Sequence, residues 1–306
     1  MSLVGMIRGR RGASGFGYAS TAEEVTEGVD LSGKSILITG ANSGLGKESA
    51  RVLAKRGARI YVGARTVEKS KPIADELGGG AVPLACELSE PESVRACVRG
   101  LKESGARLDV ILCNAGIMAL PERTIHLGQE LQFLTNHLGH FVLVTGLLDQ
   151  LTDDARVVVL SSAGHAWTPS MGIQFDDLNF ANGYSGVKAY GQSKLANILF
   201  AKALARKFAG TKKTANALHP GVIATNLARH INPVLQALQP IGSAIAMKSI
   251  PEGAATQCYV AANPAVAGVT GEYFVDSNIA RSSAHSRSVE MADRLWEVSE
   301  KIVAAI

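Results

Sequence analysis

The sequence is poor in aromatic and charged residues, and it has few cysteines. Only 5% of its 306 residues are aromatic and 19% are charged. The four cysteines, Cys86, Cys97, Cys113 and Cys258, include no Cys-x-x-Cys pair. We therefore expect buried free thiols in a reducing compartment rather than a disulfide framework. The hydrophobic fraction of 46% is that of an ordinary globular core.

Clusters of positive charge are also missing. Lys and Arg number 31 and Asp and Glu number 27, which gives a formal net charge of +4. A nucleic-acid groove needs clustered positive charge, whereas these residues are scattered, so we expect no nucleic-acid partner. His137 and His140 are three residues apart, but no third ligand is evident, and we predict no metal site.

The sequence has no long hydrophobic run. Its longest uncharged stretch, Ile231–Met247, contains two prolines and Gly242 and fails as a membrane-spanning helix. The N-terminus has three arginines before its first acidic residue, Glu23, but no apolar core of a signal peptide. We predict a flexible N-terminal arm over residues 1–30 and a cytoplasmic location, with an organelle signal as the alternative.

Short apolar runs alternate with segments of helical periodicity from residue 34 onward. The expected strands are Lys34–Thr39, Arg59–Gly63, Ala81–Ala85, Asp109–Cys113, Arg156–Leu160, Thr214–Leu218 and Glu272–Val275. The expected helices are Gly44–Arg56, Pro91–Ser104, Leu127–Gln150, Val187–Phe208, Pro251–Ala262 and Ser288–Ala304. The strands are apolar throughout, as is typical when both faces of a sheet are covered. We predict an α/β fold over residues 31–306, a single doubly wound parallel sheet of the Rossmann type flanked by helices on both faces.

A glycine-rich turn joins the first strand to the first helix, with the spacing Gly-x-x-x-Gly-x-Gly. Glycines at this place allow a tight turn and the close approach of a diphosphate, whose charge is favoured at a helix N-terminus. Loop glycines are common, but the position between a strand and a helix favours a dinucleotide site. Its expected residues are Gly40, Asn42, Ser43, Gly44, Leu45 and Gly46.

The second strand ends at Ala64-Arg65, without the acid that would accept hydrogen bonds from both ribose hydroxyls. The guanidinium of Arg65 can pair with a 2′-phosphate instead, which favours NADP(H) over NAD(H). The alternative is a solvated surface arginine. Ligands of open α/β sheets lie beyond the carboxyl ends of the strands. We therefore expect the later strand ends, Glu87-Leu88 and Asn114-Ala115-Gly116, to line the same site.

Tyr190 and Lys194 lie four residues apart near the start of a long helix, so they share one face. An ammonium beside a phenol favours the phenolate, and we expect it to lower the pKa of Tyr190 from about 10. Tyr190 would then exchange a proton with a carbonyl or alcohol oxygen. Ser162, after the fifth strand, is expected to hydrogen-bond that oxygen, and Asn136 to hold a water that links Lys194 to solvent. Each residue taken singly has a more ordinary interpretation. Tyr190 and Lys194 would be a surface pair, Ser162 a turn residue and Asn136 a buried asparagine.

Together, and in this order, the motifs resemble the short-chain dehydrogenase/reductase family. The resemblance covers residues 30–280 and is carried by Thr39–Gly46, Asn114–Gly116, Asn136, Ser162 and Tyr190–Lys194. More narrowly, Asn136–Phe141, Asp176–Asn179 and Ala189–Asn197 look like the retinol dehydrogenase branch. That branch includes the WW-domain oxidoreductase and a chloroplast translocon component.

The resemblance implies roles for particular residues. It implies a catalytic tetrad of Asn136, Ser162, Tyr190 and Lys194, of which Tyr190 and Lys194 also contact the cofactor. It further implies that Arg65 selects NADP(H) and that Pro220, Gly221 and Thr225 contact the nicotinamide carboxamide. The sequence departs from the family at Glu87, where an Asp is usual. It also lacks the N-terminal membrane helix of several retinol enzymes, which leaves a retinoid substrate open.

These expectations combine into a predicted NADP(H)-dependent oxidoreductase. It would transfer a hydride between the nicotinamide and a carbonyl or a primary or secondary alcohol of a lipophilic small molecule. The apolar residues 222–250 are predicted to form a substrate lid or, alternatively, a loop that covers the core. The alternatives are an NADP(H)-binding redox sensor or scaffold without turnover and a sugar-nucleotide epimerase or dehydratase. The sequence is compatible with a homodimer and predicts no membrane span.

Overall fold

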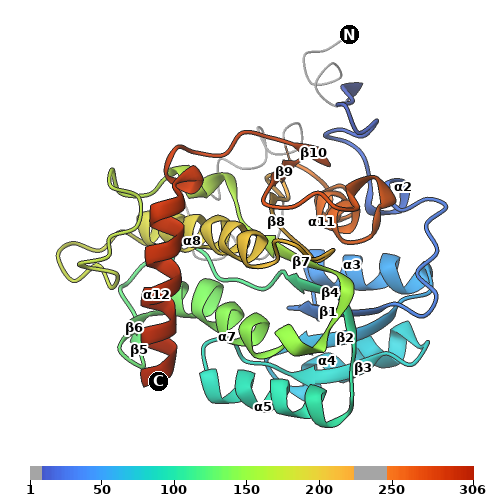
Figure 1. Ribbon diagram of the computed structural model, residues 1–306, viewed down its shortest axis with the longest axis horizontal. Helices are drawn as coiled ribbons and strands as arrows, with labels where there is room; N and C mark the ends of the chain where they lie inside the picture. Colours follow the sequence, from blue (N-terminus) through green and yellow to red (C-terminus); the bar gives the residue numbers. More distant parts are fainter. Residues whose placement is uncertain (1–8, 224–246) are drawn as a thin grey trace.

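An eight-stranded sheet forms the centre of the molecule (Figure 1). The computed structural model describes residues 9–223 and 247–306. The strands are β1 Ser35–Thr39, β2 Arg59–Ala64, β3 Val82–Ala85, β4 Leu108–Cys113, β7 Leu151–Leu160, β8 Thr214–His219, β9 Tyr273–Val275 and β10 Asn278–Ile279. Their order is β10-β9-β8-β7-β4-β1-β2-β3, and all neighbours pair in parallel except β10 with β9. The predicted doubly wound sheet is confirmed, with one antiparallel edge strand added.

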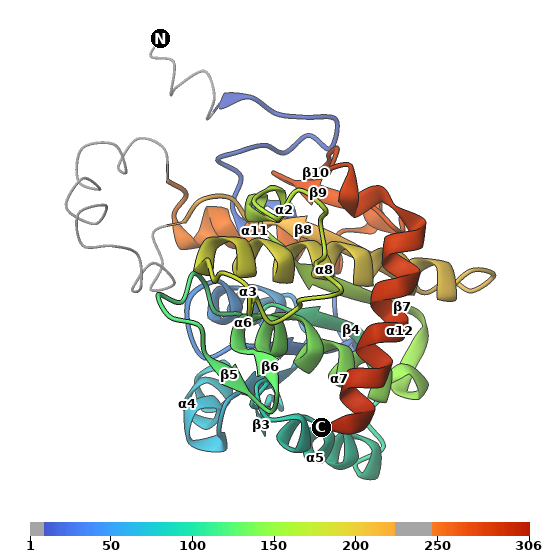
Figure 2. The ribbon, with the colours of Figure 1, turned by 90° about the vertical axis from the view of Figure 1, so that its left-hand side faces the viewer.

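Helices cover both faces of this sheet (Figures 1 and 2). One face carries α2 Ala22–Val25, α3 Gly44–Lys55, α4 Val67–Leu77 and α11 Ile250–Ala262. The other carries α5 Pro91–Glu103, α6 Leu131–Phe133, α7 Gly139–Gly146, α8 Gly186–Lys207 and α12 Val289–Ala305. Short 3₁₀ turns are Leu148–Gln150, Ala163–Ala166, Pro264–Val266 and His285–Arg287.

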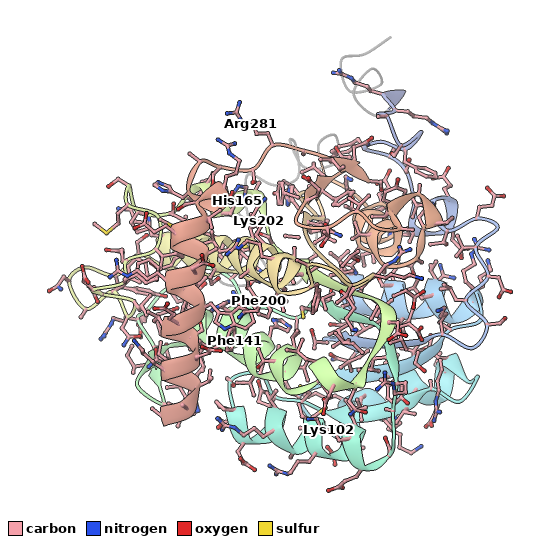
Figure 3. All side chains as sticks on the ribbon, viewed as in Figure 1. Lys102, Phe141, His165, Phe200, Lys202 and Arg281 are labelled. Atoms are coloured by element: carbon pink, nitrogen blue, oxygen red, sulfur yellow. The ribbon has the colours of Figure 1, made fainter. Side chains whose placement is uncertain are left out.

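Successive residues of the central strands enter two different cores. In β1, Ile36 and Ile38 lie in the core beneath α3 and α11, whereas Leu37 lies in the core beneath α5, α7 and α8. Because side chains alternate across a strand, a sheet covered on both faces needs apolar residues at every position. In the second core Phe141 of α7 and Phe200 of α8 point toward one another, with ring centroids 5.4 Å apart (Figure 3).

The predicted helix Leu127–Gln150 is wrong at both ends. A β-hairpin precedes it, in which β5 Ile125–His126 pairs antiparallel with β6 Gln129–Glu130. The turn residues Leu127 and Gly128 have φ of 49° and 73°, the left-handed conformation that a type I′ hairpin turn needs at both positions. Helical structure begins at Leu131 and passes through a π-helical segment, Leu134–Leu138, to the end of α7 at Gly146.

Part of the predicted flexible arm packs against the domain. The helix α2 buries Ala22 and Val25 completely, in the core that it shares with α3 and α11. Glu23 forms ion pairs with Arg51 (2.9 Å) and Lys55 (3.1 Å) of α3. The prediction of an arm over all of residues 1–30 is therefore wrong for α2, and residues 1–8 lie outside the described part of the chain.

The predicted lid falls mostly on residues that the structure does not describe. Residues 224–246, with Thr225 among them, lie outside the described residues. The described residues on either side meet, because Ile223 and Lys248 form a parallel bridge and the Lys248 amide donates to the Val222 carbonyl at 2.8 Å. The predictions of a lid or a covering loop therefore stay predictions.

Three further expectations can be compared with the described residues. All four cysteines are free and buried, as predicted. None of the helices in residues 9–223 and 247–306 is long and apolar enough to cross a bilayer. The same two ranges contain no group of three His, Cys, Asp or Glu side chains that could hold a metal ion.

Candidate active site

Tyr190 and Lys194 lie side by side in the first turns of α8. The helix begins after Ser185, whose hydroxyl accepts from the Lys188 amide. Tyr190 is 5% exposed and Lys194 is 3% exposed, and the Lys194 Nζ lies 5.7 Å from the centroid of the Tyr190 ring. Nζ donates to the carbonyl of Leu160, the last residue of β7, at 3.2 Å. The predicted pairing on one helix face is confirmed.

The expected acidification of the phenol is wrong. Burial raises the pKa of Tyr190, and a hydrogen bond with the Ser162 side chain only partly opposes this rise. Burial also lowers the pKa of Lys194 to about 8. Desolvation disfavours the charged form of each group. At neutral pH the phenol therefore carries its proton, as a proton donor requires.

Ser162 is held beside Tyr190 by the turn that follows β7. Its Oγ accepts from the Gly164 amide at 3.1 Å and so caps the 3₁₀ turn Ala163–Ala166. A Cβ at Gly164 would lie 2.9 Å from the Tyr190 ring, so a glycine there permits the close approach of ring and turn. The preceding Ser161 donates its hydroxyl to the Lys194 carbonyl at 2.7 Å. β7 and α8 are thereby tied together at the point where the two side chains meet.

Asn136 lies in the π-helical segment, fully buried. Its Oδ1 accepts from the Ile117 amide at 2.8 Å, and its Nδ2 donates to the Ile117 carbonyl and to Ser193 Oγ, both at 2.9 Å. The side chain therefore fixes the chain after β4 to α8. The expectation that Asn136 holds a water for Lys194 stays a prediction, since Oδ1 accepts only one of the two hydrogen bonds that an amide oxygen can accept.

The carboxyl end of β4 joins the two halves of the site. Asn114 Nδ2 donates to the Thr39 carbonyl at 2.8 Å, at the start of the glycine-rich turn. A Cβ at Gly116 would lie 3.3 Å from Lys194 Nζ and 3.0 Å from Asn136 Oδ1. Ala115 lies between these residues and contacts the glycine-rich turn. A Cβ at Gly40 would lie 3.0 Å from the Cβ of Ala115. The structure thus brings the predicted turn and the predicted tetrad to one end of the sheet.

Two residues outside the predicted set, Thr39 and His140, connect these groups. The Thr39 hydroxyl accepts from the amides of Asn114 and Ala115, both at 3.0 Å, and lies 2.8 Å from His140 Nε2. His140 Nδ1 donates to the Asn136 carbonyl at 3.0 Å, since a carbonyl only accepts. Nε2 then accepts from the Thr39 hydroxyl, and burial lowers the pKa of this neutral imidazole to about 4. In the sequence, His140 stood out as a metal-ligand candidate and as part of the Asn136–Phe141 motif, without a role in this network.

The glycine-rich turn has the shape that a diphosphate requires. Gly40 and Gly44 adopt φ of 64° and 54°, and a Cβ at Gly46 would lie 2.3 Å from the Gly40 carbonyl oxygen. The helix α3 begins at Gly44, and the Ser43 side chain does not cap it, so its first amides point toward the turn. Asn42, Ser43 and Leu45 are at least partly exposed. These residues fit a nicotinamide dinucleotide.

Two of the residues predicted for the adenosine end, Arg65 and Glu87, lie near one another after β2 and β3. Arg65 follows β2, is 68% exposed, and its Nε lies 4.0 Å from Glu87 Oε2. Glu87 Oε1 accepts from the Ser89 hydroxyl at 3.0 Å. Leu88 differs from the expectation, because its side chain is buried in the core and its carbonyl abuts α7, 2.3 Å from where a Cβ of Gly139 would lie. A backbone contact is what Leu88 can offer a ligand.

The carboxyl end of β8 carries the last predicted contacts. Pro220 and Gly221 follow His219, and Gly221 has φ of 99°. A Cβ at Gly221 would lie 2.7 Å from Lys248 Cδ. Lys248 is 1% exposed and forms an ion pair with Asp276 at 2.5 Å. This segment is thus fixed by the chain on the far side of residues 224–246.

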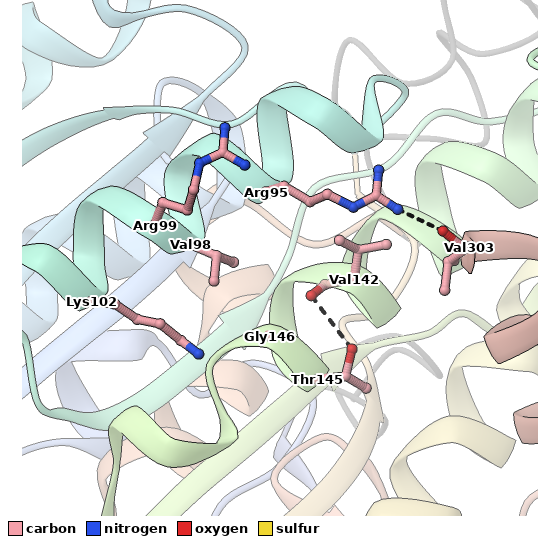
Figure 4. A pocket seen from close by; sticks show the side chains of 8 residues that line it. All are labelled: Arg95, Val98, Arg99, Lys102, Val142, Thr145, Gly146 and Val303. Carbon is pink, nitrogen blue, oxygen red and sulfur yellow. Dashed lines mark hydrogen bonds between the residues drawn. The ribbon is translucent and has the colours of Figure 1, made fainter. Parts of the chain in front are cut away.

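Two surface grooves lie away from these residues. One, of about 440 Å³, lies between α5, α7 and the C-terminal end of α12 (Figure 4). Arg95 closes one side by donating to the Val303 carbonyl at 2.6 Å. The other, of about 480 Å³, lies at the amino ends of β1, β4 and β7. Neither groove is lined by a residue of the predicted site.

Known proteins resemble this chain over most of its length. Residues 40–277 match the family model described as enoyl-(acyl carrier protein) reductase. Short-chain dehydrogenase TIC 32 B, chloroplastic, from Brassica napus is 42% identical, with both chains covered completely. Retinol dehydrogenase 14 from Mus musculus is 39% identical over 90% of this chain and 87% of its own.

Solved structures share the fold. A crystal structure of an uncharacterized protein from Mycobacterium paratuberculosis has a TM-score of 0.75 and 33% identity, and covers 92% of this chain and 97% of its own. The angucycline C-6 ketoreductase LanV with bound NADP has a TM-score of 0.63 and 26% identity, and covers 80% and 95%. With the family model and these full-length relatives, the chain belongs to the short-chain dehydrogenase/reductase family, whose members are oxidoreductases that use nicotinamide cofactors.

Proposed function

We propose that this chain is an NADP(H)-dependent enzyme that interconverts a carbonyl group and an alcohol on a lipophilic small molecule. The observation that carries the proposal is the pair of Tyr190 and Ser162. The Tyr190 side chain interacts with that of Ser162, and the centroid of its ring lies 5.7 Å from the buried Lys194 Nζ, at the same end of the sheet as the glycine-rich turn. A phenol, a hydroxyl and an ammonium around one point can bind and protonate a carbonyl oxygen.

The cofactor would lie along the carboxyl ends of β1, β2, β4 and β8. The turn Gly40–Gly46 would hold its diphosphate at the start of α3, and Arg65 would hold a 2′-phosphate. Lys194 would hold the nicotinamide ribose hydroxyls, and Pro220 and Gly221 the carboxamide. When bound, the nicotinamide ring supplies or accepts the hydride.

The protein's own contribution is proton transfer and orientation. In reduction, Ser162 Oγ would donate to the carbonyl oxygen and Tyr190 would give it a proton. The raised pKa of Tyr190 keeps that proton in place at neutral pH. The pKa of Lys194, about 8, leaves it mostly cationic at pH 7, where it favours the transient phenolate. Asn136 would fix Ile117 and α8 in place, and would hold the water that links Lys194 to solvent.

Replacing the phenol tests the proposed proton donor. We expect Tyr190→Phe to lower the rate of NADPH oxidation with aldehydes and ketones by about 10²- to 10⁴-fold, while NADPH affinity changes by less than about threefold, since the ring is retained. Tyr259→Phe, which removes the hydroxyl of a tyrosine packed against Phe16 and Phe274, is the matched control. Equal rates for Tyr190→Phe and wild type would exclude Tyr190 from the chemistry.

The cofactor preference has its own test. We expect Arg65→Ala to lower kcat/KM for NADPH by about 10- to 100-fold, because a charge-assisted pair is lost, and to leave NADH unaffected. Lys71→Ala removes another exposed cation, one paired with Asp75, and should change neither value. The preference would be contradicted if wild type used NADH and NADPH with equal kcat/KM, or if Arg65→Ala had no effect.

The same assays separate the alternatives. A sensor or scaffold would bind NADPH but would not oxidise it with any of the carbonyl compounds. A sugar-nucleotide enzyme would act on such nucleotides instead. The location can be tested with a fluorescent fusion in plant cells, because two relatives from Brassica napus are named chloroplastic and favour the organelle alternative. Dimerisation is tested by analytical ultracentrifugation.

A further inference from the structure

The Ser162–Ala163 peptide unit is hydrogen-bonded on both sides by imidazoles, an arrangement that we call the grip. Its carbonyl, that of Ser162, accepts from His165 Nδ1 at 2.7 Å. Its amide, that of Ala163, donates to His219 Nδ1 at 3.1 Å. His165 lies in the same 3₁₀ turn (Figure 3), and His219 is the last residue of β8. Residues from two separate parts of the chain therefore hold one peptide plane.

The hydrogen-bond partners determine where each imidazole carries its proton. A carbonyl only accepts, so His165 Nδ1 is protonated. His165 Nε2 accepts from the Ser283 amide at 3.1 Å, so it has no proton and the ring is neutral. His219 Nδ1 accepts from an amide and is likewise unprotonated. The grip therefore needs two different tautomers, an Nδ1–H at His165 and a free Nδ1 at His219.

The surroundings of both rings favour these neutral forms. Burial lowers the pKa of His219 to about 4, with Lys248 and His165 acting in the same direction and Asp276 opposing them. Burial also lowers the pKa of His165, and its ring packs against Tyr273 with centroids 5.1 Å apart. Neither imidazole takes part in the proton transfer proposed above.

The grip completes the fixation of Ser162. On its other side, Ser161 donates its amide to the Leu218 carbonyl and its hydroxyl to the Lys194 carbonyl, both at 2.7 Å. The Ser161 bonds fix the residue before Ser162, and the imidazoles hold the peptide plane after it, so the orientation of Ser162 Oγ toward Tyr190 depends on both. Removing one histidine partner would free a plane at the residue that has to meet the substrate oxygen.

We propose that His165 and His219 are positioning residues that hold Ser162 in line with Tyr190 by gripping the Ser162–Ala163 peptide unit. This inference rests on the proposed function, because it assigns the two imidazoles a task in that reaction. In this proposal the histidines act through Ser162, because their hydrogen bonds are to the Ser162–Ala163 peptide unit. The segment around Ser283, near the start of α12, is thereby linked to the geometry of Ser162.

Variants that keep or remove one hydrogen-bonding atom test the proposal. In His219→Asn, Oδ1 can accept where Nδ1 did, and in His165→Asn, Nδ2 can donate where Nδ1–H did; His219→Leu and His165→Leu remove these atoms. We expect each Leu variant to lower kcat by about 5- to 100-fold, with KM for NADPH within about threefold of wild type, and each Asn variant to recover most of the loss. The Leu/Leu double variant should lose little more than the worse single variant, since both act on one peptide unit.

Two results would overturn the inference. One is Asn variants that are as impaired as the Leu variants, and the other is Leu variants with wild-type kcat. If the Leu variants do not fold, ¹⁵N NMR of wild type decides, because the inference requires protonated Nδ1 at His165 and unprotonated Nδ1 at His219. If the wild-type protein fails to oxidise NADPH with every carbonyl compound tested, the proposed function is refuted instead. The NMR result would still show whether the two imidazoles hold the peptide unit.

Discussion

At the scale of single residues, Lys194 lowers the stability of the fold at a position that the proposed reaction needs. Its ammonium is buried, and its pKa is lowered from 10.5 to about 8. The charged form is therefore disfavoured in the folded chain by about 3 kcal/mol relative to the unfolded chain. The Leu160 carbonyl, which accepts from Lys194 Nζ, would keep a hydrogen bond without Lys194, because Asn197 Nδ2 also donates to it at 3.0 Å.

We therefore expect Lys194→Met to raise the free energy of unfolding at pH 7 by up to about 3 kcal/mol while abolishing turnover. The gain should shrink between pH 8 and 10.5, because over that range the unfolded wild type binds more protons than the folded one and wild-type stability rises. Urea unfolding at pH 7 and pH 10 measures both effects. Lys202→Met, on the same helix at a less buried position, should gain less; a destabilised Lys194→Met protein would contradict the expectation.

The residue scale also shows where sequence reasoning stops. The spacing of Tyr190 and Lys194 predicted their proximity correctly, because helical geometry alone determines it. The direction of the Tyr190 pKa shift depends on how much water the fold removes, and spacing carries no such information. The hydrogen bonds between Asn136 and Ile117 were not predicted for a similar reason, since Ile117 lies in a loop with no recognisable pattern. The histidines at 140, 165 and 219 had no signal except their place after a strand or beside Asn136.

At the scale of elements, α2 is attached by packing more than by charge. Val25 is completely buried, whereas the ion pairs of Glu23 join side chains that are about a third or more exposed. We expect Val25→Ala to lower the free energy of unfolding by about 2 kcal/mol and Glu23→Gln to lower it by less than about 1 kcal/mol. Urea unfolding at low and high salt distinguishes them, because only the Glu23 effect should shrink with salt. A larger loss for Glu23→Gln would contradict the packing argument.

The strands and long helices were predicted well, and the errors share a cause. Continuous apolar runs identify strands covered on both faces, and the same pattern set the order of elements correctly. The hairpin before α6 was missed because its turn is Leu127-Gly128 instead of the Asn-Gly or Asp-Gly typical of type I′ turns. The helix α4 was missed because it contains Pro72, a residue that usually argues against a helix interior. Tertiary packing overrides local preference at both places.

At the scale of the whole molecule, buried neutral histidines make the fold sensitive to acid. Burial lowers the pKa of His137 to about 3 and those of His140 and His219 to about 4. The unfolded chain binds protons at these residues from about pH 6.5 downward, whereas the folded chain does not. Stability that is fully present above pH 6.5 is therefore lost as the pH falls toward 4.

We expect the free energy of unfolding to fall by several kcal/mol between pH 7 and pH 4.5, about 2 kcal/mol or more for each of these histidines. Urea midpoints across this range measure the loss. His137→Leu removes one titrating imidazole from the core, and its stability should depend less steeply on pH than that of wild type. Identical slopes for the two proteins would show that His137 does not contribute.

The link from Thr39 through His140 to Asn136 limits how this molecule can be re-engineered. A graft that imports the cofactor turn of another dehydrogenase would replace residues 39–46 as a cassette. That cassette carries the hydroxyl on which His140, a hundred residues away, depends. An incoming turn without a hydroxyl at position 39 would leave a buried imidazole nitrogen without its donor, so residue 140 would then have to be exchanged together with the turn.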